Sequence, residues 1–121
     1  MATLKRLPEI TVLEYQTPSG YRPYVEWIRE LKDRRAAALI RTRISRVRLG
    51  QFGNHRNVGD KVWELKINFG PGYRVYYARA GQTVVLLLCG GIKRSQDADI
   101  SKACEYWKDW QRSNVKQEKE R

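Results

Sequence analysis

Two basic residues of this chain face each other across a hairpin that the sequence pattern predicts. Between Val62 and Tyr77, apolar and polar residues alternate on both sides of a Gly-Pro-Gly turn, which is typical of two antiparallel strands. If both apolar sets cover one core, Lys66 pairs with Arg74, because a slip of one residue would turn every side chain over. Cations opposed on a sheet repel, so we expect an anion to bind between them. The register predicts the pairs Trp63–Tyr77, Leu65–Val75, Lys66–Arg74 and Ile67–Tyr73.

A third basic residue, Lys93, follows the next predicted strand. Thr83–Cys89 is a continuous apolar run, as expected at the centre of a sheet. A two-residue turn at Gly81-Gln82 would pair residue 76 with 87 and residue 74 with 89. Counting by twos from residue 89 then places Gly91 and Lys93 on the face of Arg74. We therefore expect the three basic side chains on one open face of the sheet.

Three cations on one face suit phosphate binding and a reaction that builds negative charge on phosphorus. RNA supplies its own nucleophile, the 2′-hydroxyl, so a protein that cleaves it needs no metal, cofactor or nucleophilic side chain. A lysine crowded by other cations has a lowered pKa and can act as a base, which suits Lys66 or Lys93. Arg74 would hold the phosphate in a fork, and Tyr73 or Tyr76 would stack on a base or orient the phosphate.

His55, in the Gly- and Asn-rich loop predicted for Gln51–Asp60, is a rival general base. It is the one side chain of this sequence with an ordinary pKa near neutrality. A lone loop histidine is also an ordinary surface residue, and the cations would equally suit the solvated face of an antiparallel sheet. The sequence pattern leaves these alternatives open.

The composition favours a polyanionic partner. The chain has 121 residues, with 24 Lys and Arg against 13 Asp and Glu, a net charge of +11 and a pI near 10.0. Such an excess favours nucleic acid. No apolar run approaches the roughly 20 residues that span a bilayer, and no Cys/His spacing fits zinc. Cys89 and Cys104 fall in apolar patterns, so we expect buried thiols in a reducing cytoplasm.

The remaining elements are one strand and three helices, which gives one compact α+β domain. Ile10–Tyr15 is the strand, and Pro23, Asp33 and Ser95 are placed to start the helices. The expected order is strand, two helices, a three-stranded antiparallel meander and a helix, with the helices packed on one side of the sheet. Gly90 and Gly91 lack side chains and would let another backbone approach. The expected segments are a basic lead at 1–9, the domain at 10–110 and a mobile polar tail at 111–121.

The second predicted helix carries arginines without any acidic residue between them. Its predicted buried side chains are Ala36, Ile40, Ile44 and Val47, and its outer face carries Arg34, Arg35, Arg41, Arg43, Arg46 and Arg48. No i,i+4 pair can neutralise this face. It is either a solvated surface or one that follows a phosphate backbone. For RNA binding we single out Arg34, Arg41, Arg48 and Arg94.

Three motifs in order give the chain a resemblance to a known family. They are Trp63–Ile67, Gly70–Tyr77 and Leu88–Ile100, within a similarity that runs from about Ile10 to Trp107. The chain resembles the RelE/ParE superfamily of type II toxin–antitoxin toxins and within it the HigB-type addiction module killer proteins. The resemblance implies a small α+β domain. It also matches Lys66, Arg74 and Lys93 to the family's basic sheet residues.

The resemblance implies a cytoplasmic toxin that cleaves mRNA on the ribosome. Its implied partner is an antitoxin, usually a helix-turn-helix protein of the HigA kind, which neutralises the toxin and carries it to operator DNA. Two alternatives stay open, a ParE-like inhibitor of DNA gyrase and a non-catalytic nucleic-acid-binding partner of the antitoxin. The proton donor and acceptor stay open among Lys66, Lys93 and His55.

Overall fold

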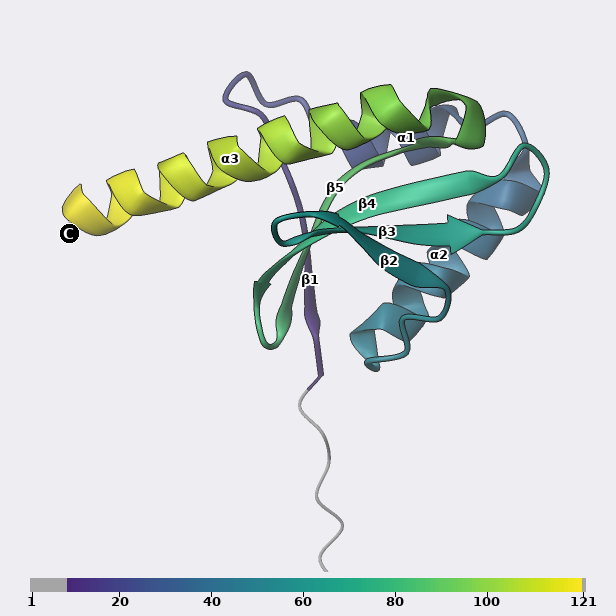
Figure 1. The fold of residues 1–121 in the computed structure, drawn as a ribbon, viewed down its shortest axis with the longest axis horizontal. Helices are drawn as coiled ribbons and strands as arrows, with labels where there is room; N and C mark the ends of the chain where they lie inside the picture. Colours follow the sequence, from purple (N-terminus) through teal and green to yellow (C-terminus); the bar gives the residue numbers. More distant parts are fainter. Residues whose placement is uncertain (1–8, 121) are drawn as a thin grey trace, which may run out of the picture.

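The protein folds as an α+β domain with one five-stranded sheet, as the sequence predicts (Figure 1). The computed structural model describes residues 9–120, with side chains through residue 114, so almost all of the predicted basic lead at 1–9 lies outside the described residues. The strands are β1 (Thr11–Glu14), β2 (His55–Gly59), β3 (Val62–Ile67), β4 (Tyr73–Gly81) and β5 (Val84–Ile92). The helices are α1 (Pro23–Glu30), α2 (Arg34–Arg48) and α3 (Gln96–Glu120), with a 3₁₀ turn η1 (Lys93–Ser95) before α3.

The sheet order is β1-β5-β4-β3-β2, so the last strand of the chain lies beside the first. β1 runs parallel to β5, and the other neighbours are antiparallel. The parallel pair follows from the chain path, because the α1–α2 crossover and the meander separate β1 from β5 in sequence. β1 and β2 are therefore the two edges of the sheet.

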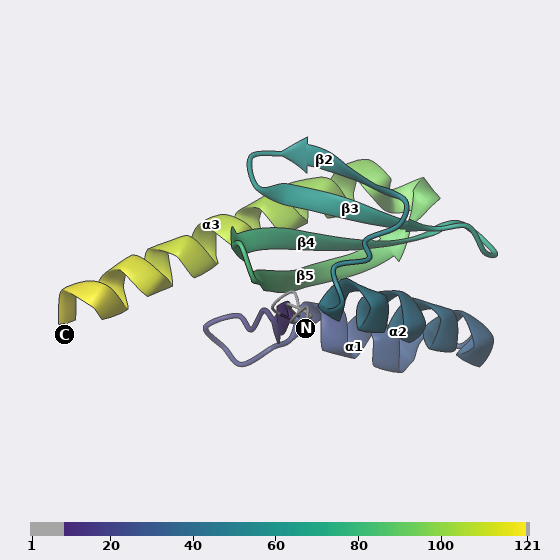
Figure 2. The ribbon, with the colours of Figure 1, turned by 90° about the horizontal axis from the view of Figure 1, so that it is seen from below.

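The helices lie on both faces of the sheet, and the prediction of one-sided packing is wrong. α1 and α2 cover one face and α3 covers the other (Figure 2). The reason lies in the continuous apolar run of β5. Val85 and Leu87 enter the core against α1 and α2, whereas Leu86 and Leu88 enter the second core beneath α3. A strand that is apolar on both faces needs cover on both.

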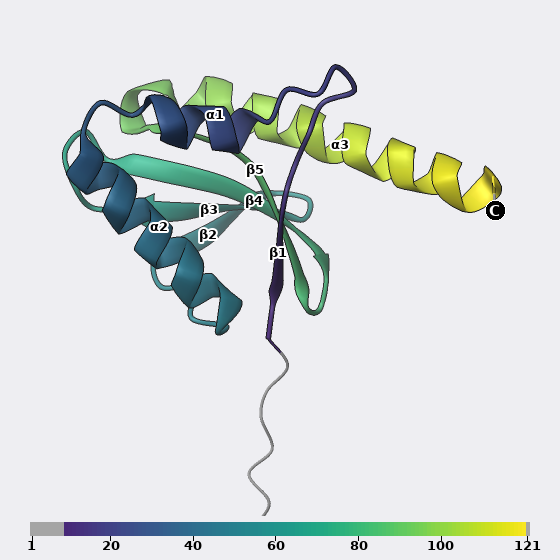
Figure 3. The same ribbon diagram turned by 180° about the vertical axis from the view of Figure 1, so that it is seen from behind.

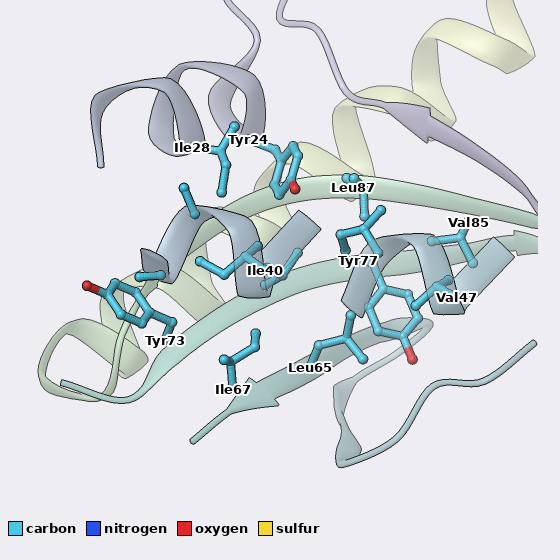
Figure 4. Close-up of a cluster of buried hydrophobic side chains, with 14 residues drawn as sticks. Tyr24, Ile28, Ile40, Val47, Leu65, Ile67, Tyr73, Tyr77, Val85 and Leu87 are labelled. Atoms are coloured by element: carbon cyan, nitrogen blue, oxygen red, sulfur yellow. The ribbon is translucent and has the colours of Figure 1, made fainter. Parts of the chain in front are cut away.

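The core beneath α1 and α2 holds the residues that the alternating pattern assigned to it. Tyr24 and Ile28 of α1 and Ile40 and Val47 of α2 pack onto the sheet (Figure 4). The strand residues in this core are Leu65, Ile67, Tyr73, Val75, Tyr77, Val85 and Leu87. The predicted buried face of the second helix is thus confirmed.

The predicted register between β3 and β4 is confirmed. The structure pairs Trp63–Tyr77, Leu65–Val75, Lys66–Arg74 and Ile67–Tyr73. The predicted register between β4 and β5 is wrong, because Tyr76 pairs with Cys89 and Arg74 with Gly91. The connecting turn is Gln82-Thr83, and irregularities at Tyr76/Tyr77 and Arg79/Gly81 shift the pairing. Gly91 nevertheless shares the face of Arg74, as expected.

β2 occupies a stretch that the sequence pattern predicts as a loop. Its residues are exposed or half-buried, and it pairs with β3 at the edge of the sheet. An edge strand of polar residues and glycine lacks the apolar alternation that marks a strand. Only the partner strand defines it.

The helix boundaries follow the predicted capping residues. Pro23 is the first residue of α1, and the Asp33 side chain accepts hydrogen bonds from the backbone N–H groups of Arg35 and Ala36, both at 3.1 Å. α3 begins at Gln96 as predicted, but it continues through residues 111–120, which the sequence analysis assigned to a mobile tail. This stretch has no glycine or proline to end a helix, and it extends past the sheet (Figure 3).

Gly90 and Gly91 accommodate side chains, not another backbone. A Cβ atom at Gly90 would collide with the Trp27 indole of α1, and a Cβ atom at Gly91 would collide with the Asp99 carboxylate of α3. The two glycines therefore let helices on opposite faces approach β5 closely. The expectation of a close approach holds, but the approaching groups are side chains.

We expect Gly90→Ala to destabilise the protein by about 1–3 kcal/mol, because the added methyl overpacks the sheet against Trp27. Gly81→Ala is the control, since a Cβ atom there would meet only Val84, at 4.0 Å. Urea unfolding followed by tryptophan fluorescence measures both variants. Equal stability of the two variants would contradict the packing role of Gly90.

Candidate functional site

Lys66, Arg74 and Lys93 converge at the end of the sheet where β3 turns into β4. Lys66 lies across from Arg74, and Arg74 lies across from Gly91, which places these positions in one row over three strands. The Gly72 carbonyl accepts hydrogen bonds from Arg74 Nη1 and from the Lys93 backbone N–H, both at 2.8 Å. The turn residue Gly72 thus holds Arg74 next to the start of η1.

Arg74 is buried, whereas the sequence analysis predicts an open, solvated face. The side chain is 3% exposed, because η1 and α3 lie over this part of the sheet. Its Nε lies 3.5 Å from Glu64 Oε2 and is a buried nitrogen without a hydrogen-bond partner among the described residues. Lys66 is half-buried and Lys93 is exposed, so solvent reaches the cluster from these two lysines.

Glu64 is the carboxylate at the centre of this cluster, and it is 1% exposed. Its Oε1 accepts a hydrogen bond from Arg56 Nε at 3.0 Å. Its Oε2 accepts from the Tyr76 hydroxyl at 3.1 Å and from Gln96 Nε2 at 3.0 Å. The donors come from β2, β4 and α3, so one buried charge connects both sheet partners of β3 to the covering helix.

Glu64 also alters the titration of its neighbours. Burial and the nearby carboxylate of Glu64 raise the pKa of the Tyr76 hydroxyl well above its ordinary value. The hydrogen bond to Glu64 raises the pKa of the Arg56 guanidinium. Tyr76 therefore stays protonated as a donor, and Arg56 stays a cation. The sequence analysis did not single out Arg56 or Gln96, because their place in the cluster depends on β2 and on the packing of α3.

The two tyrosines expected to contact RNA bases are both buried. Tyr73 is 6% exposed and lies on the opposite face, where its ring meets Trp27 edge to face at 6.3 Å. Tyr76 is fully buried beneath α3. Neither ring can stack on a base in this structure, because the alternation that puts them in the sheet also puts them in its two cores.

His55 does not lie beside Lys66, Arg74 or Lys93. His55 is in β2 and pairs with Leu65 of β3, so its ring is on the face opposite Lys66. The centroid of its ring lies 5.4 Å from that of Phe52 and 5.2 Å from that of Trp63. Its Nδ1 lies 2.8 Å from the Gly53 carbonyl, so Nδ1 is the donor in this contact. The structure does not bring this rival general base to Lys66, Arg74 or Lys93.

The predicted RNA-binding arginines lie at separate places. Arg34 is exposed at the start of α2, and Arg41 and Arg48 line a pocket beside β1. Arg94 lines a second pocket, of about 340 Å³, formed by residues 93–98 at the start of α3. This second pocket shares Lys93 and Gln96 with the cluster. Of the four arginines, Arg94 is thus the one next to the candidate site.

Arg43, on the predicted outer face of α2, has a structural role. Its guanidinium donates hydrogen bonds to the backbone carbonyls of Lys66 at 2.7 Å, Phe52 at 2.8 Å and Asn54 at 3.3 Å. Burial, and to a lesser degree Arg46, lowers the pKa of this guanidinium. Arg43 therefore ties α2 to the end of β3 that carries Lys66.

Comparison with protein families decides the affiliation of the chain. The family model of phage-derived proteins like Gp49 (DUF891) matches residues 26–105. The chain belongs to this Gp49-like family. The family is a toxin-like one of the RelE type, which agrees with the resemblance in the sequence. The matched range includes the whole cluster around Glu64 and excludes β1.

The chain is also similar to a protein whose name states no activity. It is an uncharacterized protein of Haemophilus influenzae, 47% identical over 77 residues, which are 64% of this chain and 78% of the relative. Within the described part of this Gp49-like chain, no group of His, Cys, Asp and Glu is placed to hold a metal ion. None of its described helices is long and apolar enough to cross a membrane.

We expect Glu64→Gln to lower the free energy of unfolding by about 3 kcal/mol or more, because it leaves the buried Arg74 cation without its counter-charge. Glu105→Gln, at an exposed position of α3, is the matched control and should change stability by less than about 0.5 kcal/mol. Urea unfolding at neutral pH measures both. If Glu64→Gln unfolds like the control, the carboxylate is not the centre of this network.

Proposed function

We propose that this protein is the toxin of a type II toxin–antitoxin module, of the HigB kind, and that it inhibits translation by cleaving mRNA on the ribosome. The toxin-like family supports the first part of the proposal. The observation that carries the second part is the opposition of Lys66 and Arg74, with Lys93 held beside them through Gly72.

Arg74 is suited to stabilise negative charge on a phosphate. Its guanidinium is held in place by the Gly72 carbonyl and the Glu64 carboxylate, so it needs little reorganisation when charge develops. A cation fixed in a site that excludes water stabilises a transition state more strongly than one in bulk solvent. Because its side chain is only 3% exposed, we assign to Arg74 the stabilisation of the five-coordinate phosphorus through its fixed charge and not through direct contact.

Lys66 and Lys93 are the groups available for proton transfer. In the proposed reaction the 2′-oxygen forms a bond to phosphorus while the bond to the 5′-oxygen breaks, which leaves a 2′,3′-cyclic phosphate and a 5′-hydroxyl. One lysine, as the neutral amine, accepts the 2′-hydroxyl proton, and the other, as the ammonium, donates a proton to the leaving oxygen. The proposal leaves open which lysine plays which part.

The charge of the whole chain supports binding to RNA. The net charge of +11 attracts a phosphate backbone over a long range and speeds association. Arg56 and Arg94 flank the cluster, and both side chains are exposed. We propose that these two arginines grip the RNA on either side of the scissile phosphate.

We expect Lys66→Ala and Lys93→Ala each to slow mRNA cleavage by about 10²–10⁴-fold, the contribution typical of a positioned acid or base. Lys61→Ala is the control, since Lys61 is an exposed lysine at the opposite end of β3. Primer extension on mRNA after induction, with purified ribosomes present and absent, measures the cleavage. Undiminished cleavage by both lysine variants would contradict the assigned site.

Arg74→Ala is not a clean test, because it would leave the buried Glu64 carboxylate unpaired and destabilise the fold. Arg74→Lys keeps the charge and is the preferred variant. We expect it to fold and to cleave more slowly, since a lysine cannot reproduce the planar fork of the guanidinium. Circular dichroism establishes whether the variant is folded before its activity is compared.

The same induction experiment separates the alternative activities. DNA damage with intact mRNA would instead indicate inhibition of DNA gyrase. Absence of both damage and cleavage would indicate a non-catalytic partner of the antitoxin. The proposal also requires a neutralising antitoxin, which we expect to be a small helix-turn-helix protein encoded beside this gene. Co-expression of that protein should restore growth and abolish the cleavage.

A further inference from the structure

The pocket beside β1 lies on the other face of the sheet, between β1, α1 and α2. It has a volume of about 330 Å³ and none of its residues belongs to the cluster around Glu64. Its apolar lining residues are Val12, Val25, Ile28, Ile44 and Leu87, with Tyr24 beside them. Ile28, Tyr24 and Leu87 also appear at the junction of α1 with the sheet in Figure 4. The pocket is therefore open onto the main core of the protein.

Two arginines stand at the rim of this pocket. Arg41 and Arg48 are both exposed and lie two turns apart on α2, with Ser45 between them. Among the described residues neither arginine makes an ion pair, and α2 contains no acidic residue that could neutralise them. Glu14 of β1 is the one carboxylate in the lining. The rim thus keeps an excess of positive charge beside an apolar floor.

The titration of Tyr24 agrees with this placement. Burial raises the pKa of Tyr24 to about 12, Glu14 adds to the rise, and Arg41 and Arg48 oppose it. All three charged groups therefore lie within electrostatic reach of the Tyr24 hydroxyl. That hydroxyl stays protonated at neutral pH and can donate a hydrogen bond to an acceptor in the pocket.

Among the described residues, no strand pairs with the outer side of β1, which forms one wall of the pocket. Just before β1, the Ile10 backbone N–H donates to the Arg48 carbonyl of α2 at 2.9 Å. β1 is the outermost strand. The backbone N–H of Thr11 donates to the Thr83 carbonyl at 2.7 Å, and that of Tyr15, the residue after β1, donates to the Leu87 carbonyl at 2.9 Å. In a strand the backbone groups alternate in direction, so those of Val12 and Glu14 point away from β5. An edge of this kind is a template for an added strand.

We propose that the pocket and the β1 edge form a docking groove for an extended acidic and apolar segment of a protein partner, which adds a strand beside β1 and places a carboxylate between Arg41 and Arg48. The apolar floor favours a protein over a phosphate backbone, since a phosphate backbone has no apolar side chains to place on it. With this assignment, Arg41 and Arg48 bind a protein partner and not RNA, in contrast to the prediction from the sequence. The identity of the partner as the antitoxin rests on the proposed function.

The alternation along β1 sets the pattern of the partner segment. Val12 and Glu14 face the pocket, whereas Leu13 faces the other side of the sheet and is 40% exposed. A strand added beside β1 would therefore cover Leu13 with one set of side chains and enter the pocket with the other. In a segment that alternates glutamate and leucine, the glutamates enter the pocket toward Arg41 and Arg48, and the leucines cover Leu13.

The test uses the full chain and a fluorescein-labelled ten-residue peptide that alternates glutamate and leucine, with binding followed by fluorescence anisotropy. We expect Arg41→Glu/Arg48→Glu to weaken binding at least about tenfold, since two favourable charges become repulsive. The matched control is Arg34→Glu/Arg46→Glu, at exposed positions of α2 outside the pocket. Both double variants change the net charge equally, so a non-specific attraction would fall equally in both.

A second peptide tests the added strand. It has the same side chains but carries N-methyl groups on alternate backbone nitrogens. Two such peptides are possible, methylated at the odd or at the even positions, and only one of them loses the N–H groups that would face β1. We expect one of the two possible methylated peptides to lose binding and the other to keep it. Equal binding by both, equal losses in the two arginine variants, or no binding by the wild-type chain would each overturn the proposal.

Two further measurements separate this groove from other occupants and from the proposed function. Sedimentation velocity compares the wild-type chain with the Arg41→Glu/Arg48→Glu variant. We expect no dimer that depends on these two arginines. A wild-type dimer that the variant loses would assign the groove to a second copy of the chain. Lys66→Ala/Lys93→Ala should bind the peptide as the wild type does. Failure of the wild type to cleave RNA would refute the proposed function alone, and loss of peptide discrimination would refute the groove alone.

Discussion

The buried carboxylate of Glu64 is the interaction on which the candidate site depends. It is the counter-charge of the Arg74 guanidinium, whose side chain is 3% exposed. It also accepts hydrogen bonds from Arg56, Tyr76 and Gln96. A buried arginine without a counter-charge would cost several kcal/mol, and so would the carboxylate without its donors. The cluster is therefore stable only when β2, β3, β4 and the start of α3 are assembled together. Charge at the site and folding of this end of the domain are coupled.

The two-sided burial of β5 determines the rest of the architecture. α1 and α2 cover the face that contains Val85 and Leu87, and α3 covers the face that contains Leu86 and Leu88. Close contact on each face depends on the missing side chains of Gly90 and Gly91. Because α3 lies over the face that carries Arg74, the predicted open basic surface becomes a buried guanidinium flanked by two accessible lysines. That arrangement holds the Arg74 guanidinium against the Gly72 carbonyl and the Glu64 carboxylate and leaves the two lysines accessible to solvent.

The basic residues separate into groups with different surroundings. Lys66, Arg74 and Lys93 lie around a buried polar network, Arg43 ties α2 to backbone carbonyls, and Arg41 and Arg48 border an apolar pocket beside an edge strand. A net charge of +11 alone would suggest one nucleic-acid surface. The structure instead separates the proposed catalytic cluster on one face from the proposed protein-docking groove on the other.

The sequence alone determined the α+β class, the helix starts at Pro23, Arg34 and Gln96, and the pairing of Lys66 with Arg74. These features follow from local rules, because capping residues and the two-residue period of a strand act over a few neighbours. Only the tertiary structure decided the burial of Arg74 and Tyr76, the edge strand β2, and the placement of His55 on the face opposite Lys66. Each depends on which surface a distant element covers, and polar alternation looks the same whether water or α3 lies above it.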